Sequence, residues 1–509
     1  MEIRRAARLP IVTIDPTTPV IVGVAQITTR PGEHPRYEDR PTPLSLMTGS
    51  LSAAADDAGA GRRLLERLEE LVAIGSFTWH PRDPARLVAE ELSMRDVRTR
   101  LTPTGGNLPQ LLVHESARRI ARGELEAIAV VGAEAMYART LARREGRRVD
   151  WVLQGDDVPL PEVVGEDRIP FTEEEYRQGL TLPIEVYPLF ENARRARQGW
   201  SIEEHRARVG QLWANFATVA ATNPHAWIGD APSAATIITP SPTNRMIAFP
   251  YTKLLVANQS VDMGASFIMT SLELARALGV AEEKMVFPQH GADANDHWFV
   301  SERPALDGSP AMAAIWRSLR DLGVDVDSIA YLDLYSCFPT VVQTACDVLG
   351  LDPLDASRIP TLTGGLTFGG GPGNNYVTHA IATAVERLRA DPTSQGLVTA
   401  LGWFSTKHAW GTYATSPPPQ GFQWRSAQAD VDELPRMSVT TDDSTVTIET
   451  YTVTHERDGA PKRLIAAGRR DDGQRVWCHS LDAATASSAE TEELIGRRAE
   501  VRDGVLPLT

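Results

Sequence analysis

The order of predicted elements in this chain of 509 residues occurs twice, and such a repeat restricts the fold more than any other feature of the sequence. In the first half, an Ala-rich helical stretch from Leu44 is followed by the apolar run LVAIGS at Leu71. In the second half, a helical stretch from Pro310 is followed by the run IAYLDLYS at Ile329. Each run has the length and composition of a buried strand.

The elements that follow repeat as well. In the first half, the pair Gly105-Gly106 opens a helix over residues 111–122, and the strand AIAVVGAEA begins at Ala127. In the second half, the segment GGLTFGGGPGNN at Gly364 opens a helix, and the strand GLVTALG begins at Gly396. Strands that alternate with helices are typical of α/β folds. We therefore expect two α/β halves, each with a glycine-rich entry to a helix.

Composition shifts divide the chain further. The first half is expected to comprise residues 1–139 and 250–275, and the second half residues 276–416. Residues 140–249 are polar and rich in charge, which is typical of an excursion that covers a site. The run Pro417-Pro418-Pro419 predicts a linker. Beyond it, residues 420–509 contain short alternating runs separated by Asp-Gly turns, which predict a separate small antiparallel β-barrel.

Charge and cysteine usage exclude several classes of function. Acidic residues outnumber basic ones, 66 to 51, so the chain repels nucleic acid and anionic membrane surfaces. No apolar run reaches the length of a membrane helix. The run over residues 9–14 is too short for a signal peptide and precedes Pro16. The three cysteines form neither a metal cluster nor an even disulfide set. We expect a cytoplasmic protein without a bound metal.

Five segments, in this order, resemble motifs of the thiolase superfamily over about the first four-fifths of the chain: VGVAQIT, HESARRIARGELEAIAVVGAEAM, SVDMGASFIMTSLELAR, YLDLYSCFPT and TGGLTFGGGPGN. The fourth is similar to the His-Asp-Cys-Phe motif of the sterol-carrier-protein branch. The chain most closely resembles the thiolase-like protein type 1 group, often labelled acetyl-CoA acetyltransferase, which has an added C-terminal domain and segments like GGPGNNY and TKHAWGTY.

This resemblance implies an α/β duplicated thiolase fold, with two βαβαβαββ halves in five layers, and a C-terminal OB-like β-barrel. It also implies a role in lipid metabolism, with a coenzyme A thioester as the ligand and no bound cofactor.

Four departures from the thiolase motifs argue against ordinary thiolase chemistry. The position of the nucleophilic cysteine falls near Asn107, and an amide cannot form an acyl-enzyme. Gly371 replaces the histidine of the Gly-His-Pro motif, and Tyr335 replaces the histidine of the third motif. The last acid/base motif reads LGWFSTKH from Leu401. We therefore expect neither thiolysis nor Claisen condensation.

Each catalytic candidate has a plainer interpretation. Tyr335 could serve as an acid or base if a cation or a helix N-terminus lowers its pKa, or its hydroxyl could cap a buried network. Cys337 could be a nucleophile, but a buried small hydrophobe is the commoner role. His408, beside Lys407, lies where an acid/base residue belongs, but a helix-dipole or surface role is favoured. Asn107 is most simply a helix N-cap.

Two groups of residues could bind the ligand. Gly370, Gly371 and Asn374 belong to a glycine-rich turn whose N–H groups could bind an oxygen anion, although a tight chain reversal explains them too. Coenzyme A phosphates need positive charge, which the cluster in the excursion could supply, although a solvated helix face explains the same cluster. That cluster is Arg194, Arg195 and Arg197.

The sequence thus predicts a thiolase-like protein that binds or acts on acyl-CoA in a cleft between its halves. One alternative is a carbon–carbon lyase or acyltransferase that uses Tyr335. Another is a non-catalytic acyl-CoA or lipid binder, or a scaffold subunit. We expect a monomer rather than a homodimer.

Overall fold

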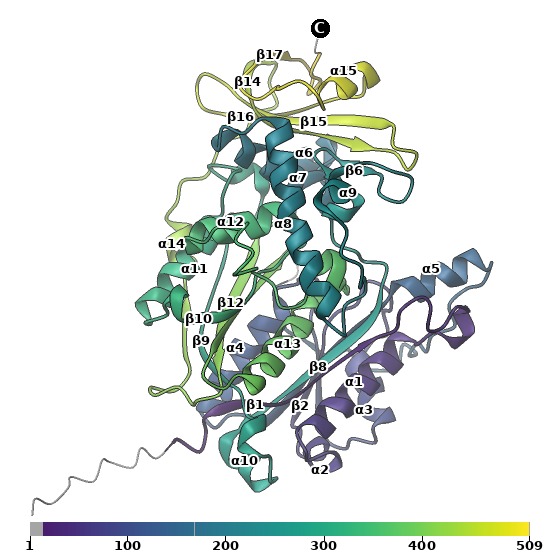
Figure 1. The fold of residues 1–509 in the computed structure, drawn as a ribbon, viewed down its shortest axis with the longest axis vertical. Coiled ribbons are helices and arrows are strands. Elements are labelled where there is room, and N and C mark those ends of the chain that lie inside the picture. The colour runs from purple at the N-terminus through teal and green to yellow at the C-terminus, as the bar shows by residue number, and fades with distance from the viewer. Residues whose placement is uncertain (1–13, 167, 508–509) are drawn as a thin grey trace, which may run out of the picture.

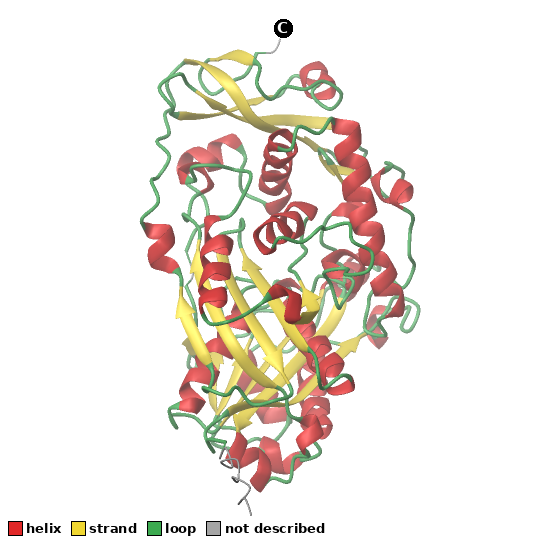
Figure 2. Ribbon diagram, turned by 60° about the vertical axis from the view of Figure 1, so that its left-hand side comes forward, coloured by secondary structure: helices red, strands yellow, loops and turns green. Residues whose placement is uncertain are grey.

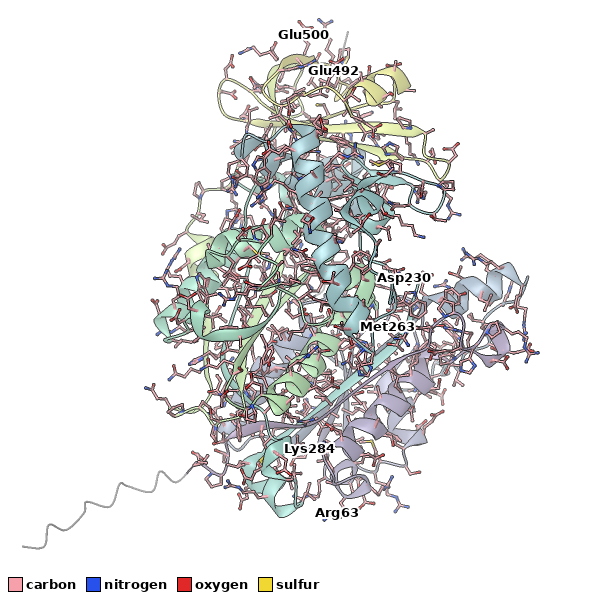
Figure 3. The ribbon with its side chains drawn as sticks, in the orientation of Figure 1. Arg63, Asp230, Met263, Lys284, Glu492 and Glu500 are labelled. Atoms are coloured by element: carbon pink, nitrogen blue, oxygen red, sulfur yellow. The ribbon has the colours of Figure 1, made fainter. Side chains whose placement is uncertain are left out.

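The computed structural model describes residues 14–166 and 168–507. The α/β body occupies the lower part of the long axis and a β-rich domain the upper end (Figure 1). The exposed residues Arg63, Glu492 and Glu500 mark the two ends (Figure 3). No helix in the described ranges is both long and apolar enough to cross a membrane. The expectation that residues 9–16 carry no secretion signal falls mostly outside these ranges.

The first half contains a six-stranded mixed sheet with strand order β1-β8-β4-β2-β3-β5. In that order its strands are Pro19–Thr28, Asp262–Ser271, Ala127–Ala135, Glu70–Ala73, Arg98–Leu101 and Glu162–Val163.

The second half contains a five-stranded sheet with order β10-β11-β12-β9-β13. Its strands are Ile329–Asp333, Gln395–Gly402, Lys407–Ala414, Phe287–Asn295 and Gln423–Ser426. The run β9-β12-β11-β10 repeats the run β1-β8-β4-β2, since each has two antiparallel pairs followed by a parallel pair. The predicted duplication is confirmed.

Helices separate and cover the two sheets (Figure 2). The central layer consists of α4 and α13, and the outer layers are formed chiefly by α1 and α3 on one side and α11 and α12 on the other. Successive side chains of β4 point to opposite faces of the sheet. Ile128 and Val130 therefore pack in the central core, whereas Ala129 and Val131 pack in the outer one. The helices just named, in chain order, are Pro43–Asp57, Pro84–Glu91, Leu108–Ala121, Pro310–Asp321, Pro339–Leu349 and Tyr376–Ala390.

The excursion between the halves is mostly helical. Its longest helix, α8, begins after Ser201, whose side chain accepts a hydrogen bond from the Glu204 N–H at 3.1 Å. The excursion and the short helices elsewhere comprise α2 (Arg62–Leu65), α5 (Met136–Arg144), α6 (Glu173–Gln178), α7 (Pro183–Arg197), α8 (Ile202–Thr222), α9 (Ala234–Ile238), α10 (Leu272–Ala277), α14 (Gln428–Asp432) and α15 (Ala483–Ser488).

The C-terminal domain shares its sheet with the excursion. The sheet has the order β16-β15-β14-β6-β7, with β17 also on β14, and the described pairings leave it open rather than closed into a barrel. The strands are β6 (Met246–Ala248), β7 (Tyr251–Thr252), β14 (Ser444–His455), β15 (Pro461–Arg469), β16 (Arg475–Ser480) and β17 (Arg498–Val501). The domain is therefore less separate than the sequence suggested.

The domain boundary at residues 417–419 was placed too early. The proline run forms a loop, and β13, which follows it, returns to the body and pairs in parallel with β9. A Pro-rich stretch marks a break in regular structure, but only strand pairing shows whether the chain has left a domain.

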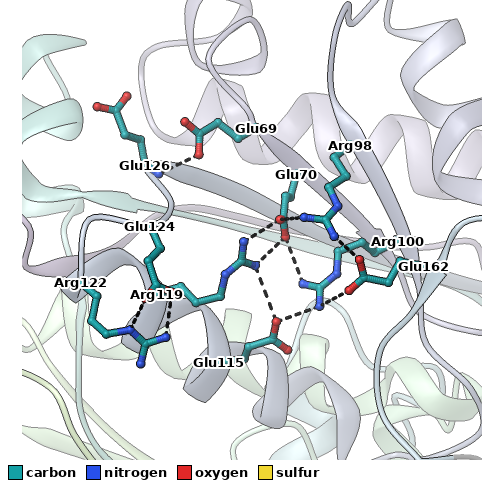
Figure 4. Close-up of polar contacts among 10 residues, drawn as sticks. All are labelled: Glu69, Glu70, Arg98, Arg100, Glu115, Arg119, Arg122, Glu124, Glu126 and Glu162. Carbon is teal, nitrogen blue, oxygen red and sulfur yellow. Dashed lines mark hydrogen bonds and ion pairs between the residues drawn. The ribbon is translucent and has the colours of Figure 1, made fainter.

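A network of ion pairs closes the outer edge of the first sheet (Figure 4). The buried carboxylate of Glu70 on β2 accepts hydrogen bonds from Arg119 of α4 at 2.7 and 2.8 Å and from Arg100 of β3 at 3.0 Å. Arg98 of β3 pairs with both Glu70 and Glu162 of β5. This network ties α4 and the edge strands into one unit.

Candidate functional site

A cavity of about 500 Å³ lies between the two halves. It is formed by the N-terminal ends of α4, α7 and α12, the glycine-rich turn before α13 and the end of β11. None of the described lining residues is Asp, Glu, His, Lys or Arg. Those that matter below are Phe77, Gly106, Leu182, Tyr187, Tyr335, Cys337, Gly371, Gly373, Asn374 and Trp403. The cavity is thus suited to an apolar, uncharged group.

Gly106 is the residue at the start of α4 that faces the cavity. A Cβ on Gly106 would lie 2.5 Å from the Tyr335 hydroxyl oxygen and 2.6 Å from the Leu401 carbonyl oxygen, so only glycine fits. Asn107 does not line the cavity, and its buried side-chain oxygen has no hydrogen-bond partner. Asn107 is the N-cap residue of α4, as expected, but its side chain makes none of the expected capping hydrogen bonds. The backbone N–H groups of Gly106 and Asn107 have no partner among the described residues.

Tyr335 follows β10 and provides a hydroxyl group at the cavity wall. Its hydroxyl has no hydrogen-bond partner in the described part of the chain, and its ring packs edge-on against Tyr376. Burial, together with the Cys337 thiol, raises the pKa of Tyr335 well above its ordinary value. The lowered pKa that an acid/base role required is therefore absent. Tyr335 remains a neutral hydrogen-bond donor.

Cys337 lines the same cavity but is not an activated thiol. Burial raises its pKa to about 12, so the nucleophilic thiolate is scarce at neutral pH. Tyr187 of α7 lies beside it, and the Tyr187 hydroxyl donates to the Trp403 carbonyl at 2.7 Å and accepts from the Ser405 N–H at 2.9 Å. Cys337 is accordingly a small apolar part of the wall.

The glycine-rich turn before α13 supplies fewer free donors than expected. The Gly371 N–H donates to the Asn258 carbonyl at 2.9 Å, so it cannot serve a ligand oxygen. The Asn374 side chain donates to the Gly75 carbonyl at 2.7 Å and accepts from the Gly105 N–H at 2.9 Å. Gly370, with a φ of 111°, lies outside the lining residues. This turn holds the wall in place, and the partnerless N–H groups lie at α4.

His408 and Lys407 both lie on β12, but on opposite faces. His408 points away from the cavity toward Asp296, 3.5 Å away, and accepts or donates no bond at the cavity wall. Lys407 reaches the other face, where its Nζ donates to the Thr104 carbonyl at 2.7 Å. Both residues are buried, so a surface role was wrong. Strand alternation separates two adjacent side chains that the sequence had grouped.

The arginine cluster of α7 is structural. Arg194 and Arg195 are at most 2% exposed, and they pair with Asp347 and Glu493 respectively. Arg197 pairs with Asp307 and Asp347. None of the three lines the cavity. Neither phosphate binding nor a solvated face describes Arg194 and Arg195, because both arginines are buried and already paired with a carboxylate.

Phe77, Tyr187 and Trp403 are three of the lining residues that the sequence analysis did not propose as site residues. Phe77 comes from the loop after β2, and its backbone N–H donates to the buried carboxylate of Glu134 at 2.6 Å. Trp403 has a φ of 56° at the turn between β11 and β12. Phe77 belongs to a loop without a motif, Tyr187 to the helix α7 of the excursion, and Trp403 to the segment LGWFSTKH, and only the folded chain brings the three together at the cavity.

Comparison with known proteins identifies the family. The family model described as the thiolase-like protein type 1 additional C-terminal domain matches residues 427–504. No curated protein sequence matches the chain. Two solved structures share the fold at low identity. The Ltp2-ChsH2(DUF35) aldolase is 19% identical, with 79% of this chain and 98% of that chain covered and a TM-score of 0.57. The dimeric peroxisomal thiolase of Saccharomyces cerevisiae is 12% identical, with 79% and 99% covered and a TM-score of 0.55.

A third solved structure is similar over the whole chain. The monomeric SCP2-thiolase like protein type 1 from Mycobacterium smegmatis is 34% identical, with 98% of this chain and 100% of that chain covered, and its TM-score is 0.83. The expected thiolase superfamily membership and the α/β fold with an added C-terminal domain are confirmed. The chain belongs to the SCP2-thiolase-like protein type 1 family.

Proposed function

We propose that this protein binds an acyl thioester, such as an acyl-CoA, without forming a covalent intermediate. The acyl group lies in the cavity between the halves, and the Tyr335 hydroxyl donates a hydrogen bond to the thioester carbonyl oxygen. The observation that carries this proposal is the Tyr335 hydroxyl, which has no hydrogen-bond partner among the described residues. Tyr187 and Cys337 are the other ionisable side chains in the described lining of the cavity.

The start of α4 supports this placement of the carbonyl oxygen. The Gly106 Cα lies directly against the Tyr335 hydroxyl, and the Gly106 and Asn107 N–H groups are without partners. N–H groups at a helix N-terminus favour partial negative charge. A carbonyl oxygen at this point would receive donors from both halves of the fold, and the acyl chain would contact the apolar walls.

Thiolysis is not supported, because the wall offers no thiolate and no base at neutral pH. Carbon–carbon bond chemistry next to the thioester is the second candidate. The specific observation in its favour is that the same donors would stabilise the enolate oxygen that forms when such a bond breaks. In this role Tyr335 acts as a neutral hydrogen-bond donor. Binding without catalysis stays the first proposal, because the described lining contains no Asp, Glu, His or Lys that could transfer a proton.

We also propose that the protein is a monomer. The outer edge of β3 is paired with β5, so this end of the first sheet offers no long free edge to a second copy. The relative from Mycobacterium smegmatis is described as monomeric. Sedimentation velocity at micromolar concentration should give one species near 55.6 kDa. A dimer that persists on dilution would contradict this assignment.

The test of the proposed function is isothermal titration calorimetry with CoA, acetyl-CoA and octanoyl-CoA. We expect octanoyl-CoA to bind more tightly than CoA, because the cavity is apolar. Tyr335→Phe should weaken octanoyl-CoA binding about three- to tenfold, the usual worth of one neutral hydrogen bond. Tyr331→Phe is the matched control, because Tyr331 lies on β10, just before Tyr335, and its hydroxyl donates to Asp391 away from the cavity.

Two outcomes would count against the proposal. If acyl-CoAs bind no better than CoA, or if Tyr335→Phe and Tyr331→Phe behave alike, the Tyr335 contact is wrong. Acetoacetyl-CoA thiolysis should be undetectable in a thiol-release assay. An acyl group found on Cys337 by mass spectrometry would show covalent chemistry instead.

A further inference from the structure

A second cavity of about 230 Å³ adjoins the main one. It is bounded by the loops after β2 and β3 and by α1 and α3. Its apolar wall consists of Met47, Ile74, Trp79, Pro81, Pro84, Leu101 and Pro103. The two cavities share three wall residues, which are Phe77, Thr104 and Asn374. These three form the partition between the cavities.

The polar groups of the second cavity are mostly occupied. The Ser76 hydroxyl donates to Glu134 at 3.0 Å, and the Thr102 hydroxyl accepts from the Gly75 N–H at 3.0 Å. The Asn374 amide is bound at both of its ends. Only His80, which is exposed, carries an ionisable side chain among the described lining residues. The interior thus favours an apolar group over a polar one.

Phe77 is the movable part of the partition. Its backbone is held by Glu134, but its ring is 38% exposed and has no aromatic partner in the described ranges. The ring edge lies near Gly373, where a Cβ would come within 2.9 Å of it. Thr104 and Asn374, in contrast, are fixed through the bonds that they make with Lys407, Gly75 and Gly105. Among the three shared residues, Phe77 therefore has the side chain that can change rotamer with the fewest bonds to break.

We infer that the second cavity is a subsite for the distal end of a long acyl chain, and that Phe77 controls entry to it. This inference rests on the proposed binding of an acyl group in the main cavity. A water molecule occupies about 30 Å³ in the liquid, and a methylene group is of similar size. The second cavity therefore has room for several methylene groups beyond those that the main cavity holds. Medium- to long-chain acyl groups are the class that would use both.

The test compares binding along a chain-length series, with acyl-CoAs from butyryl to hexadecanoyl and the corresponding free fatty acids. Each methylene that becomes buried should raise affinity about fourfold. Phe77→Ala opens the partition, so affinity should keep rising for at least two methylenes beyond the wild-type plateau, a gain of about tenfold or more. Leu101→Trp fills the second cavity and should weaken only the longest chains.

Leu182→Ala is the control, because Leu182 lines the main cavity but not the second one. It should change affinity for short and long chains alike. Phe77 and Leu182 are both partly exposed, so their truncation should leave the melting temperature nearly unchanged. Should Leu101→Trp fail to fold, Phe77→Trp closes the same partition and should also weaken the longest chains.

The two ligand series separate this inference from the proposed function. If Phe77→Ala moves the affinity plateau to longer chains for the fatty acids while acyl-CoAs do not bind, the subsite stands and the thioester proposal fails. If acyl-CoAs bind but the plateau is the same in the wild type, Phe77→Ala and Leu101→Trp, the subsite is refuted. If neither series binds, both are refuted.

Discussion

At the scale of the residue, Gly106 and Tyr335 are packed closely together in the cavity wall. The Tyr335 hydroxyl occupies the space into which a side chain at position 106 would extend. A side chain at position 106 and the Tyr335 hydroxyl in its present place therefore exclude one another.

Gly106→Ala tests this packing directly. The added methyl group would lie 2.5 Å from the Tyr335 hydroxyl oxygen, so Tyr335 or α4 must move. We expect a loss of stability of about 1–3 kcal/mol, typical of an overpacked site, and a loss of octanoyl-CoA binding at least as large as in Tyr335→Phe. The control is Gly229→Ala, because a Cβ there meets no atom within 4 Å. Urea denaturation and calorimetry measure both effects, and equal behaviour of the two variants would contradict the packing.

Cysteine reactivity provides a second test at this scale. Burial raises the pKa values of Cys337, Cys346 and Cys478 to about 12. A thiol with that pKa is ionised in about one molecule in ten thousand at pH 8. Iodoacetamide should therefore leave the native protein unlabelled at pH 8 but add three groups in urea, as read by mass spectrometry. Leu182→Cys, at the mouth of the same cavity, should be labelled rapidly, and rapid labelling of wild-type Cys337 would show an activated thiol.

At the scale of the element, the N-terminal ends of α4 and α13 meet at the cavity. Asn374, just before α13, accepts a hydrogen bond from the Gly105 N–H just before α4. The later turns of α4 are held by the Glu70 network, to which the helix contributes Arg119, bonded to Glu70, and Glu115, bonded to Arg100. The cavity wall thus depends on ion pairs that lie outside it.

Glu70→Gln should destabilise the protein by about 3 kcal/mol, because it leaves Arg100 and Arg119 short of a buried partner. Glu126→Gln, which breaks an exposed pair with Arg67, should cost less than about 1 kcal/mol. Denaturation in urea at pH 7 measures both. Similar losses in the two variants would show that the Glu70 network contributes nothing beyond a surface pair.

The same network predicts a dependence on pH. Burial alone would raise the pKa of Glu70, but the hydrogen bond from Arg119 and the charges of Arg100, Arg119 and Arg98 outweigh it and lower the pKa. The folded pKa is therefore below the unfolded one, near 4.3. The stabilisation is present above pH 4.3 and is lost as pH falls through the folded pKa. On acidification below about pH 4, the wild type should lose more stability than Glu70→Gln. Equal losses in the two proteins would show that the pKa of Glu70 is not lowered in the folded state.

At the scale of the whole molecule, the C-terminal domain is docked on the body through buried polar contacts. Arg475, with no exposed surface, bonds to Glu449 within the domain and to the carbonyls of Ser301 and Arg303 in the body at 2.9 and 2.8 Å. The Trp477 ring N–H donates to the Ser301 hydroxyl at 2.8 Å. The two parts should therefore unfold together.

Arg475→Met should uncouple them. It removes three bonds to body carbonyls, and we expect a loss of about 3 kcal/mol together with a split of the single calorimetric transition into two. Arg498→Met, which breaks an exposed pair with Asp471 in the same domain, should keep one transition. Two transitions in the wild type would show that the shared sheet does not couple the parts.

The sequence by itself determined the duplicated body. Periodicity and glycine placement are local properties, and both halves repeat them in the same order, so the strands at Leu71, Ala127, Ile329 and Gly396 could be predicted from the sequence. The turns of the C-terminal domain could be predicted as well, because Gly459 and Gly473 follow aspartates. Both glycines adopt positive φ angles, 93° and 87°, a region in which glycine is favoured. The motif departures at Asn107, Gly371 and Tyr335 led us to expect no thiolysis, and that expectation stays a prediction.

Only the tertiary structure decided which side chains meet in the cavity. His408 and Lys407 are neighbours in sequence but lie on opposite faces of β12, and Arg194 and Arg195 are neutralised by Asp347 and Glu493, which are distant in the chain. Burial, and not the nearby helix N-terminus, set the direction of the Tyr335 pKa. Phe77 reached the partition through a loop with no motif. All of these outcomes have the same physical reason. The direction in which a side chain points, its loss of water and its pairing with a charge depend on contacts between residues far apart in the sequence, and local patterns do not encode such contacts.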